Sequence, residues 1–320
     1  MVTTSLPADR LRSTLLGGAI GDALGHPLEN LNLAQIRAAH GTEGLTDISP
    51  LLITDDTQMT LFSFEGLMLA DVDNEMSSVY NAYRRWLATQ EQGQPSPGAT
   101  GLAAQEWLYV RRGPGQACLT GLRQTDHAQV VNPDAKGCGT VMRAAPFGLF
   151  DHSPDDAFLL AAKCARFTHG HPTAAVSAGV LARLVSLLTR GHDLNDAVRE
   201  CLRLLTYDVP SAGETRLAMR EAVKAARQST PSPEAVEMLG GGWVAEEALS
   251  IAVYCALVSD TAEEALLLAA NHSGDSDSTA AICGNLLGAA GRKLPETWAA
   301  TVEGRRTIDR LVAEATGSLN

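Results

Sequence analysis

The 320-residue sequence has no excess of basic residues, and we expect no hydrophobic segment of the kind that membrane or exported proteins carry. Its 25 Lys and Arg are outnumbered by 37 Asp and Glu, and the net charge of −12 argues against a surface that grips a nucleic acid backbone. The N-terminus lacks the charged start and apolar run of a signal peptide, and no stretch approaches the roughly 18 apolar residues of a membrane span. These absences predict a cytoplasmic protein that binds neither nucleic acid nor membrane.

The six cysteines show no pairing pattern. No two form a C-x-x-C motif. Four lie in apolar stretches, where a free thiol behaves as a small hydrophobic residue: Cys164, Cys201, Cys255 and Cys283. We therefore expect reduced cysteines with a structural role.

Hydrophobic periodicity predicts helices along most of the chain, and no segment has the alternation typical of a strand. Residues 9–23 and 245–258 read as helices, and capping signals at Ser153 and at Thr261 begin two more. No repeat, linker or low-complexity tract marks a boundary, so we expect one all-α domain over residues 1–320. Segments rich in glycine or proline are expected to be loops, three of which could border a pocket: 90–101, 112–115, 132–139 and 239–242.

Two short acidic clusters lie far apart in the chain, Thr-Asp-Asp-Thr at 54–57 and Asp-Ser-Asp-Ser at 275–278. Crowded carboxylates repel one another, and burial is tolerable only if protons or a cation cancel the charge. Mg²⁺ and Mn²⁺ bind to such oxygen ligands. Either cluster alone could equally be a helix N-cap. Because apolar or small residues flank both clusters, we interpret them as two halves of one oxygen-only metal site, in which capping and metal binding can coexist.

Further fragments carry a family resemblance: Gly17–Gly25 followed by Glu29, Lys136–Pro146, Thr168–His171 and Gly274–Ser278. In this order and spacing the sequence resembles the ADP-ribosylglycohydrolase family, which includes the dinitrogenase reductase-activating glycohydrolase and the ADP-ribosylarginine hydrolases. The match spans about residues 10–292. It implies a compact orthogonal helical bundle with a dinuclear metal cleft.

The resemblance also implies two Mg²⁺ or Mn²⁺ ions and a set of ligands for them. These ligands would be Thr54, Asp55, Asp56, Asp275, Asp277 and Ser278. Cleavage of a glycosidic bond needs acid or base assistance, for which the candidates are Glu29, Asp55 and Asp56. Glu29 could instead be a solvated loop residue.

The implied substrate-binding residues are Gly137, Cys138, Gly139, Thr140, Val141, Met142, His169 and Trp243. Backbone N–H groups of the glycine loop would face a pyrophosphate, near His169. Trp243 would stack on adenine or on the substrate, or else belong to the core. We expect Arg143 to be a structural ion-pair partner and Asp22 to orient ligands without binding the ion.

The resulting hypothesis is a metal-dependent hydrolase that releases ADP-ribose from a modified protein or small molecule, with arginine as the expected acceptor. Serine, a nucleobase and small conjugates are alternative acceptors. Two other classes are a module that binds ADP-ribose without turnover and a metal-dependent phosphohydrolase. We expect a monomer.

Overall fold

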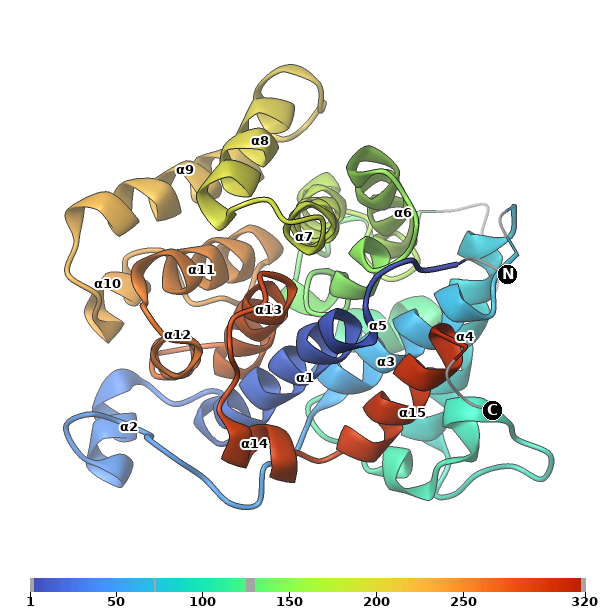
Figure 1. The fold of residues 1–320 in the computed structure, drawn as a ribbon. Coiled ribbons are helices and arrows are strands. Elements are labelled where there is room, and N and C mark those ends of the chain that lie inside the picture. The colour runs from blue at the N-terminus through green and yellow to red at the C-terminus, as the bar shows by residue number, and fades with distance from the viewer. Residues whose placement is uncertain (1–2, 72, 125–129, 318–320) are drawn as a thin grey trace.

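Helices make up the architecture of the computed structural model, which describes residues 3–71, 73–124 and 130–317 (Figure 1). Across these residues the chain forms helices α1 to α15 and short 3₁₀ helices, and it has no β-strand. One isolated antiparallel bridge joins Gly137 to Val244. The prediction of an all-α fold is confirmed.

The α-helices are α1 (Ala8–Gly25), α2 (Leu33–His40), α3 (Asp55–Met68), α4 (Glu75–Glu91), α5 (Gln116–Arg123), α6 (Pro154–Ala165), α7 (Pro172–Thr189), α8 (Leu194–Tyr207), α9 (Gly213–Gln228), α10 (Pro233–Glu237), α11 (Ala245–Val258), α12 (Ala262–Ala270), α13 (Ser276–Ala289), α14 (Glu296–Thr301) and α15 (Arg305–Ala315). The 3₁₀ helices are η1 (His26–Leu28), η2 (Gly101–Ala104), η3 (Glu106–Tyr109), η4 (Cys138–Thr140) and η5 (Ala145–Gly148).

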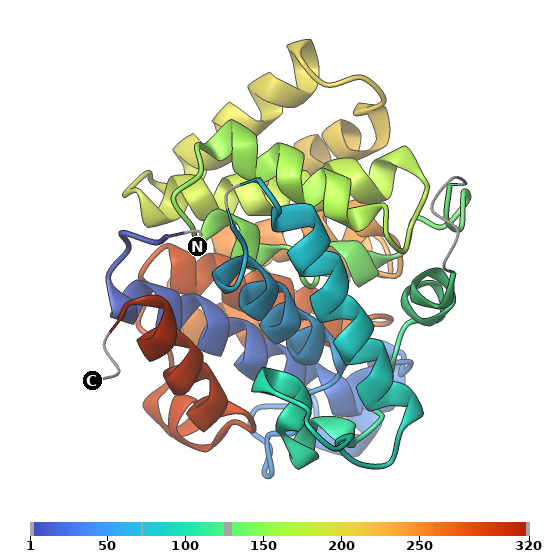
Figure 2. The same ribbon diagram turned by 90° about the vertical axis from the view of Figure 1, so that its right-hand side faces the viewer.

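Helices α1 and α13, from opposite ends of the chain, pack side by side in the centre of the molecule (Figure 1). Glycines make the contact: a Cβ atom built on Gly17 would lie 2.2 Å from the carbonyl oxygen of Gly284, and one on Gly21 would lie 2.0 Å from that of Ala280. Any side chain there would therefore push the helices apart. Helix α15 lies against the same central helix, α1 (Figure 2). This packing brings the acidic start of α13 beside the end of α1.

The capping signals in the sequence lie where the helices begin. The Ser153 side chain accepts a hydrogen bond from the Asp156 N–H at the start of α6. At α12, Thr261 and Glu264 form a reciprocal capping box. These local predictions are confirmed because each depends on residues within one turn.

Helix α7 corrects one expectation from the sequence. Its 18 residues have a mean hydropathy of 1.4, so by length and composition this helix could cross a membrane, and the statement that no stretch approaches this limit is wrong. However, 83% of α7 is buried inside the protein. The core helix of a folded protein has the same apolar composition.

Candidate functional site

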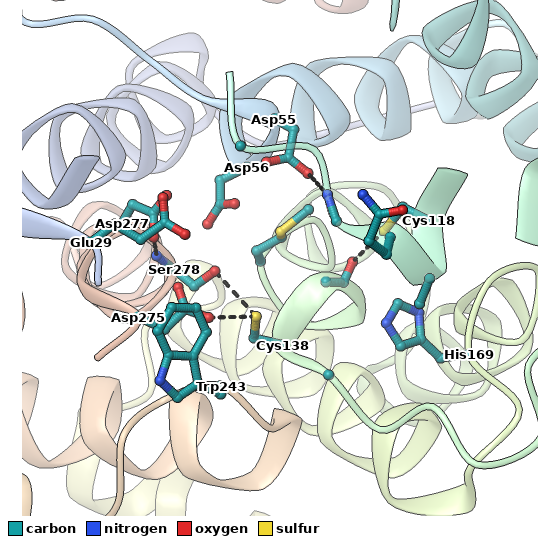
Figure 3. Close-up of a pocket in the computed structure, with 17 residues that line it drawn as sticks. Glu29, Asp55, Asp56, Cys118, Cys138, His169, Trp243, Asp275, Asp277 and Ser278 are labelled. Carbon is teal, nitrogen blue, oxygen red and sulfur yellow. Dashed lines mark hydrogen bonds between the residues drawn. The ribbon is translucent and has the colours of Figure 1, made fainter. Parts of the chain in front are cut away.

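A cleft of about 270 Å³ lies where the starts of α3 and α13 meet the loop before η4 (Figure 3). The structure brings most of the predicted site residues to its wall: Glu29, Asp55, Asp56, Gly137, Cys138, Gly139, Met142, His169, Trp243, Asp275, Asp277 and Ser278. Three predicted residues, Thr54, Thr140 and Val141, are buried behind this wall. The two acidic clusters thus meet in space, as the sequence suggested.

Asp22 of α1 holds the first acidic cluster in place. Its carboxylate accepts hydrogen bonds from the Thr54 N–H at 3.0 Å, the Thr54 hydroxyl at 2.8 Å and the Thr57 N–H at 3.0 Å. Asp22 is completely buried, and burial raises its pKa. Thr54 is also the N-cap of α3, since its side chain accepts from the Asp56 N–H. Asp22 therefore fixes the start of α3 relative to α1, in keeping with the orienting role expected for it.

The carboxylates at the acidic end of the cleft are only partly satisfied within the protein. Asp55 accepts a hydrogen bond from the Gly115 N–H at 3.1 Å, and Asp277 accepts one from the Ser278 N–H at 2.9 Å. Asp56 is 3% exposed, yet its Oδ2 atom has no hydrogen-bond partner. An unpartnered carboxylate oxygen in a buried site costs free energy unless a cation or a proton satisfies it.

Burial is the largest cause of the perturbed acidity of this cluster. It raises the pKa values of Asp55, Asp56 and Asp277 well above their usual range, and neighbouring carboxylates raise them further. Burial, followed by the charge of Asp275, also raises the pKa of the half-buried Glu29. Such a set of oxygen donors fits a hard divalent cation, which would cancel the repulsion.

Sequence reasoning missed His26, and it placed Cys138 among the substrate-binding residues without its contact to the acidic cluster. His26, Glu29 and Asp277 place potential ligand atoms within 4.8 Å of one another, and Nδ1 of His26 is buried without a partner. Cys138 places its sulfur 2.8 Å from Oδ2 of Asp275. The structure confirms that all six cysteines are free. Cys138, which the resemblance placed among the substrate-binding residues, therefore lies beside the oxygen donors of the acidic cleft.

The opposite end of the cleft is built around a neutral histidine (Figure 3). Burial and the nearby Arg143 guanidinium lower the pKa of His169 to about 3. The guanidinium, which can only donate, lies 2.6 Å from the Thr168 hydroxyl, and this hydroxyl lies 2.7 Å from Nδ1 of His169. The same hydroxyl lies 3.3 Å from the Ala165 carbonyl oxygen, so its proton has two acceptors within reach, this oxygen and Nδ1 of His169. Nε2 of His169 lies beside the glycine loop, since a Cβ atom on Gly137 would be 3.4 Å away.

Arg143 differs from its expected role as an ion-pair partner. It is 1% exposed, and no carboxylate among the described residues pairs with it. Its guanidinium instead contacts Cys118 Sγ at 3.2 Å, Thr168 Oγ1 and the face of the Tyr83 ring, whose centroid is 4.7 Å away. The cleft is consequently polarised, with carboxylates at one end and a buried positive charge behind the other.

Trp243 borders the cleft and is not a core residue. Its side chain is 44% exposed, and its carbonyl oxygen accepts a hydrogen bond from the Cys138 N–H at 3.1 Å. The glycines before it allow the tight approach of this loop to α13, because a Cβ atom on Gly242, where φ is +79°, would lie 2.7 Å from Thr279. An exposed indole at the rim can stack on a ligand.

These features define an all-α protein with an acid-lined cleft at the starts of two helices. The acidic end of the cleft suits a divalent cation, and the two ends suit chemically different parts of one ligand. The chain belongs to the ADP-ribosylglycohydrolase family, whose sequence profile matches residues 3–319. It is therefore a hydrolase of ADP-ribose glycosidic linkages. The family and the class of enzyme expected from the sequence are confirmed.

Related proteins match along nearly the whole chain. An uncharacterized protein of Archaeoglobus fulgidus is 28% identical, over 96% of this chain and 95% of its own. The ADP-ribosyl-[dinitrogen reductase] glycohydrolase of Rhodospirillum rubrum is 26% identical, over 96% and 97%. The ADP-ribosylarginine hydrolase Tri1 of Pseudomonas putida is also 26% identical, over 98% and 79%.

The fold also has a counterpart among solved structures. A chain of an ADP-ribosylglycohydrolase-related protein complex superposes with a TM-score of 0.69, at 22% identity, over 97% of this chain and 98% of that chain. This similarity concerns the helical fold and supports the architecture expected from the resemblance.

Proposed function

We propose that this protein cleaves the bond between ADP-ribose and arginine, with one end of the cleft holding the ribose and the other the pyrophosphate. The observation that carries the proposal is the polarised cleft, in which Asp56 Oδ2 is buried without a partner at the acidic end and the neutral His169 imidazole, with the Arg143 charge behind it, lies at the other. The name of one relative, an ADP-ribosylarginine hydrolase, supports arginine as the acceptor.

In this proposal the acidic end holds two divalent cations, Mg²⁺ or Mn²⁺. The donor residues are Thr54, Asp55, Asp56, Asp275, Asp277 and Ser278. Bound ions of this kind supply Lewis-acid polarisation and lower the pKa of a bound water. The protein's own contribution is to orient the donors: Asp22 fixes the start of α3, and the glycine contacts with α1 fix the start of α13. Both halves of the donor set are thereby held before substrate arrives.

Hydrolysis needs one group to take a proton from the attacking water and one to protonate the leaving nitrogen. Water forms the new bond to the anomeric carbon while the carbon–nitrogen bond breaks. Glu29 suits proton transfer because it is half-buried at the cleft and its pKa is raised by burial. Asp55 and Asp56 remain the competing candidates for the base.

The pyrophosphate would lie against His169 and the glycine loop. Among the described residues, no lysine or arginine lines the cleft, so the donors available are neutral groups: backbone N–H groups and side chains such as those of Gln116 and His169. The buried charge of Arg143 favours an anion at this end without touching it. Trp243 stands at the rim, where an adenine or an acceptor side chain could stack.

A paired hydrolysis assay tests the proposal. The purified protein receives arginine-linked and serine-linked ADP-ribosylated peptides, with and without Mg²⁺, and free ADP-ribose is measured by mass. We expect Mg²⁺-dependent release from the arginine-linked peptide. Release from the serine-linked peptide alone would change the acceptor, whereas ADP-ribose binding without release from either would favour a binding module. Phosphate as the product would indicate a phosphohydrolase.

A further inference from the structure

Cys138 places a thiol among the oxygen donors of the acidic cleft. Its Sγ atom lies 2.8 Å from Oδ2 of Asp275 and 3.5 Å from Oγ of Ser278. Both interactions are drawn in Figure 3, where Asp56 faces the same space from the opposite wall. The other five cysteines, all of them described, are buried, and none of them makes a hydrogen bond with a carboxylate.

The second observation comes from Asp56, on a different helix from Cys138 and Asp275. Its side chain is 3% exposed, and Oδ2 has no hydrogen-bond partner among the residues that the structure describes. A buried carboxylate oxygen without a partner points to a missing positive charge. Sulfur, carboxylate and hydroxyl donors therefore surround one space and come from three separate segments of the chain.

Ligand chemistry decides which cation such a mixed set prefers. Mg²⁺ and Mn²⁺ are hard ions that favour oxygen, whereas thiolate sulfur favours softer ions such as Zn²⁺. Zn²⁺ accepts sulfur together with carboxylate oxygen, at about 2.3 Å and 2.0–2.2 Å. We propose that the cleft binds Zn²⁺ through Cys138 Sγ and Asp275, with Asp56 and Ser278 as neighbouring donors, and that this binding excludes the hard cations from the same carboxylates.

The sulfur of Cys138 and the carboxylate of Asp275 need only a small adjustment to share one ion, whereas Asp56 has to move closer, because it does not form a group with them within 4.8 Å. The present 2.8 Å between Sγ and Oδ2 of Asp275 is a hydrogen-bond distance. With a tetrahedral ion between them, the same two atoms would be about 3.5 Å apart. The thiolate is the binding form, so Sγ releases its proton to solvent as the sulfur–zinc bond forms. The separation of Sγ and Ser278 Oγ is already 3.5 Å.

The test uses Co²⁺ as a spectroscopic substitute for Zn²⁺, with the full-length protein and no substrate. We expect Co²⁺ to produce a thiolate charge-transfer band in the near ultraviolet, and Zn²⁺ to remove it by competition. Cys138→Ser keeps the size and a hydrogen-bonding group, and it should lose the band and weaken the Zn²⁺ Kd at least about tenfold. Cys201→Ala, which removes a thiol from the core of α8, is the matched control and should keep both.

Two outcomes would overturn the proposal: a band that persists in Cys138→Ser, or a Zn²⁺ Kd that this substitution leaves unchanged. If Cys138→Ser fails to fold by circular dichroism, Cys138→Ala provides the same comparison. The result does not depend on hydrolysis. If the protein shows the cysteine-dependent band but no hydrolase activity, the zinc site is supported and only the proposed function is rejected. If hydrolysis is found, Zn²⁺ should inhibit it in the wild type and at least about tenfold less effectively in Cys138→Ser.

Discussion

Replacing Asp56 with asparagine should change the melting temperature in opposite directions with and without Mg²⁺. The Asp56 side chain is 3% exposed and its Oδ2 has no partner. Burial, followed by the charge of Asp55, raises its pKa well above the usual range. The amide keeps the shape of the side chain and removes its charge. The metal-free protein should therefore become more stable, while the metal-bound protein loses a ligand.

The size of the Mg²⁺ effect follows from mass action. A cation at 100 times its Kd stabilises the folded state by about 2.7 kcal/mol. For 320 residues the unfolding entropy is about 0.7 kcal/mol/K, so this corresponds to a rise of about 4 °C. If the substitution raises the Kd for Mg²⁺ about a hundredfold, the same Mg²⁺ concentration stabilises the folded state by only about 0.4 kcal/mol, which raises the melting temperature by about 0.6 °C.

The pH dependence has a defined sign. Because the folded-state pKa of Asp56 is raised, the folded protein keeps a proton that the unfolded chain has already lost. The stability of the metal-free wild type should therefore fall as pH rises from the unfolded pKa towards the folded one. Asp56→Asn should flatten this decline, and the Mg²⁺ stabilisation of the wild type should grow with pH because the cation competes with the proton.

Calorimetric melting of both proteins, over a pH series with and without Mg²⁺, measures these effects. Asp9→Asn is the control, because it makes the same chemical change at a side chain that is 93% exposed, where less than about 0.5 kcal/mol is expected. An undiminished Mg²⁺ shift in Asp56→Asn would refute the assignment of Asp56 as a ligand. If metal-free Asp56→Asn melts at a lower temperature than the metal-free wild type, the charge of Asp56 does not destabilise the metal-free protein, and this reasoning is refuted.

Three further changes test other parts of the site and fold. Glu29→Gln should lower kcat by about 10²–10⁴-fold and leave the Kd for ADP-ribose nearly unchanged, whereas an unaffected rate would assign Glu29 to an ordinary loop. Thr168→Val should destabilise by about 1.5–3 kcal/mol, because it leaves the buried Arg143 guanidinium and Nδ1 of His169 without this hydroxyl, and an unchanged denaturant midpoint would contradict a stabilising role for the contact. Gly284→Ala should cost about 1–3 kcal/mol in denaturant unfolding, since its Cβ atom would lie 1.9 Å from the Gly17 carbonyl, and a wild-type midpoint would show that the helices can separate without cost.

The tertiary structure supplied what no local pattern contained. Cys138 and Asp275 are 137 positions apart, and their 2.8 Å contact depends on how the η4 loop packs against the start of α13. Arg143 looked like an ion-pair partner because arginines usually are, but its surroundings are a hydroxyl, a sulfur and an aromatic ring from other segments. The grouping of His26 with Glu29 and Asp277 likewise arises only from the packing of α1 on α13.

The sequence by itself determined the helical composition, the capped starts of α6 and α12, and the two acidic clusters with their family resemblance. Each of these features depends on a short segment of the sequence, because capping and helical periodicity involve neighbouring residues. The tertiary structure decided which side chains share the cleft, which carboxylate oxygen lacks a partner and which charge is left unpaired. These properties depend on burial and on distances between segments far apart in the chain, and no local pattern encodes them.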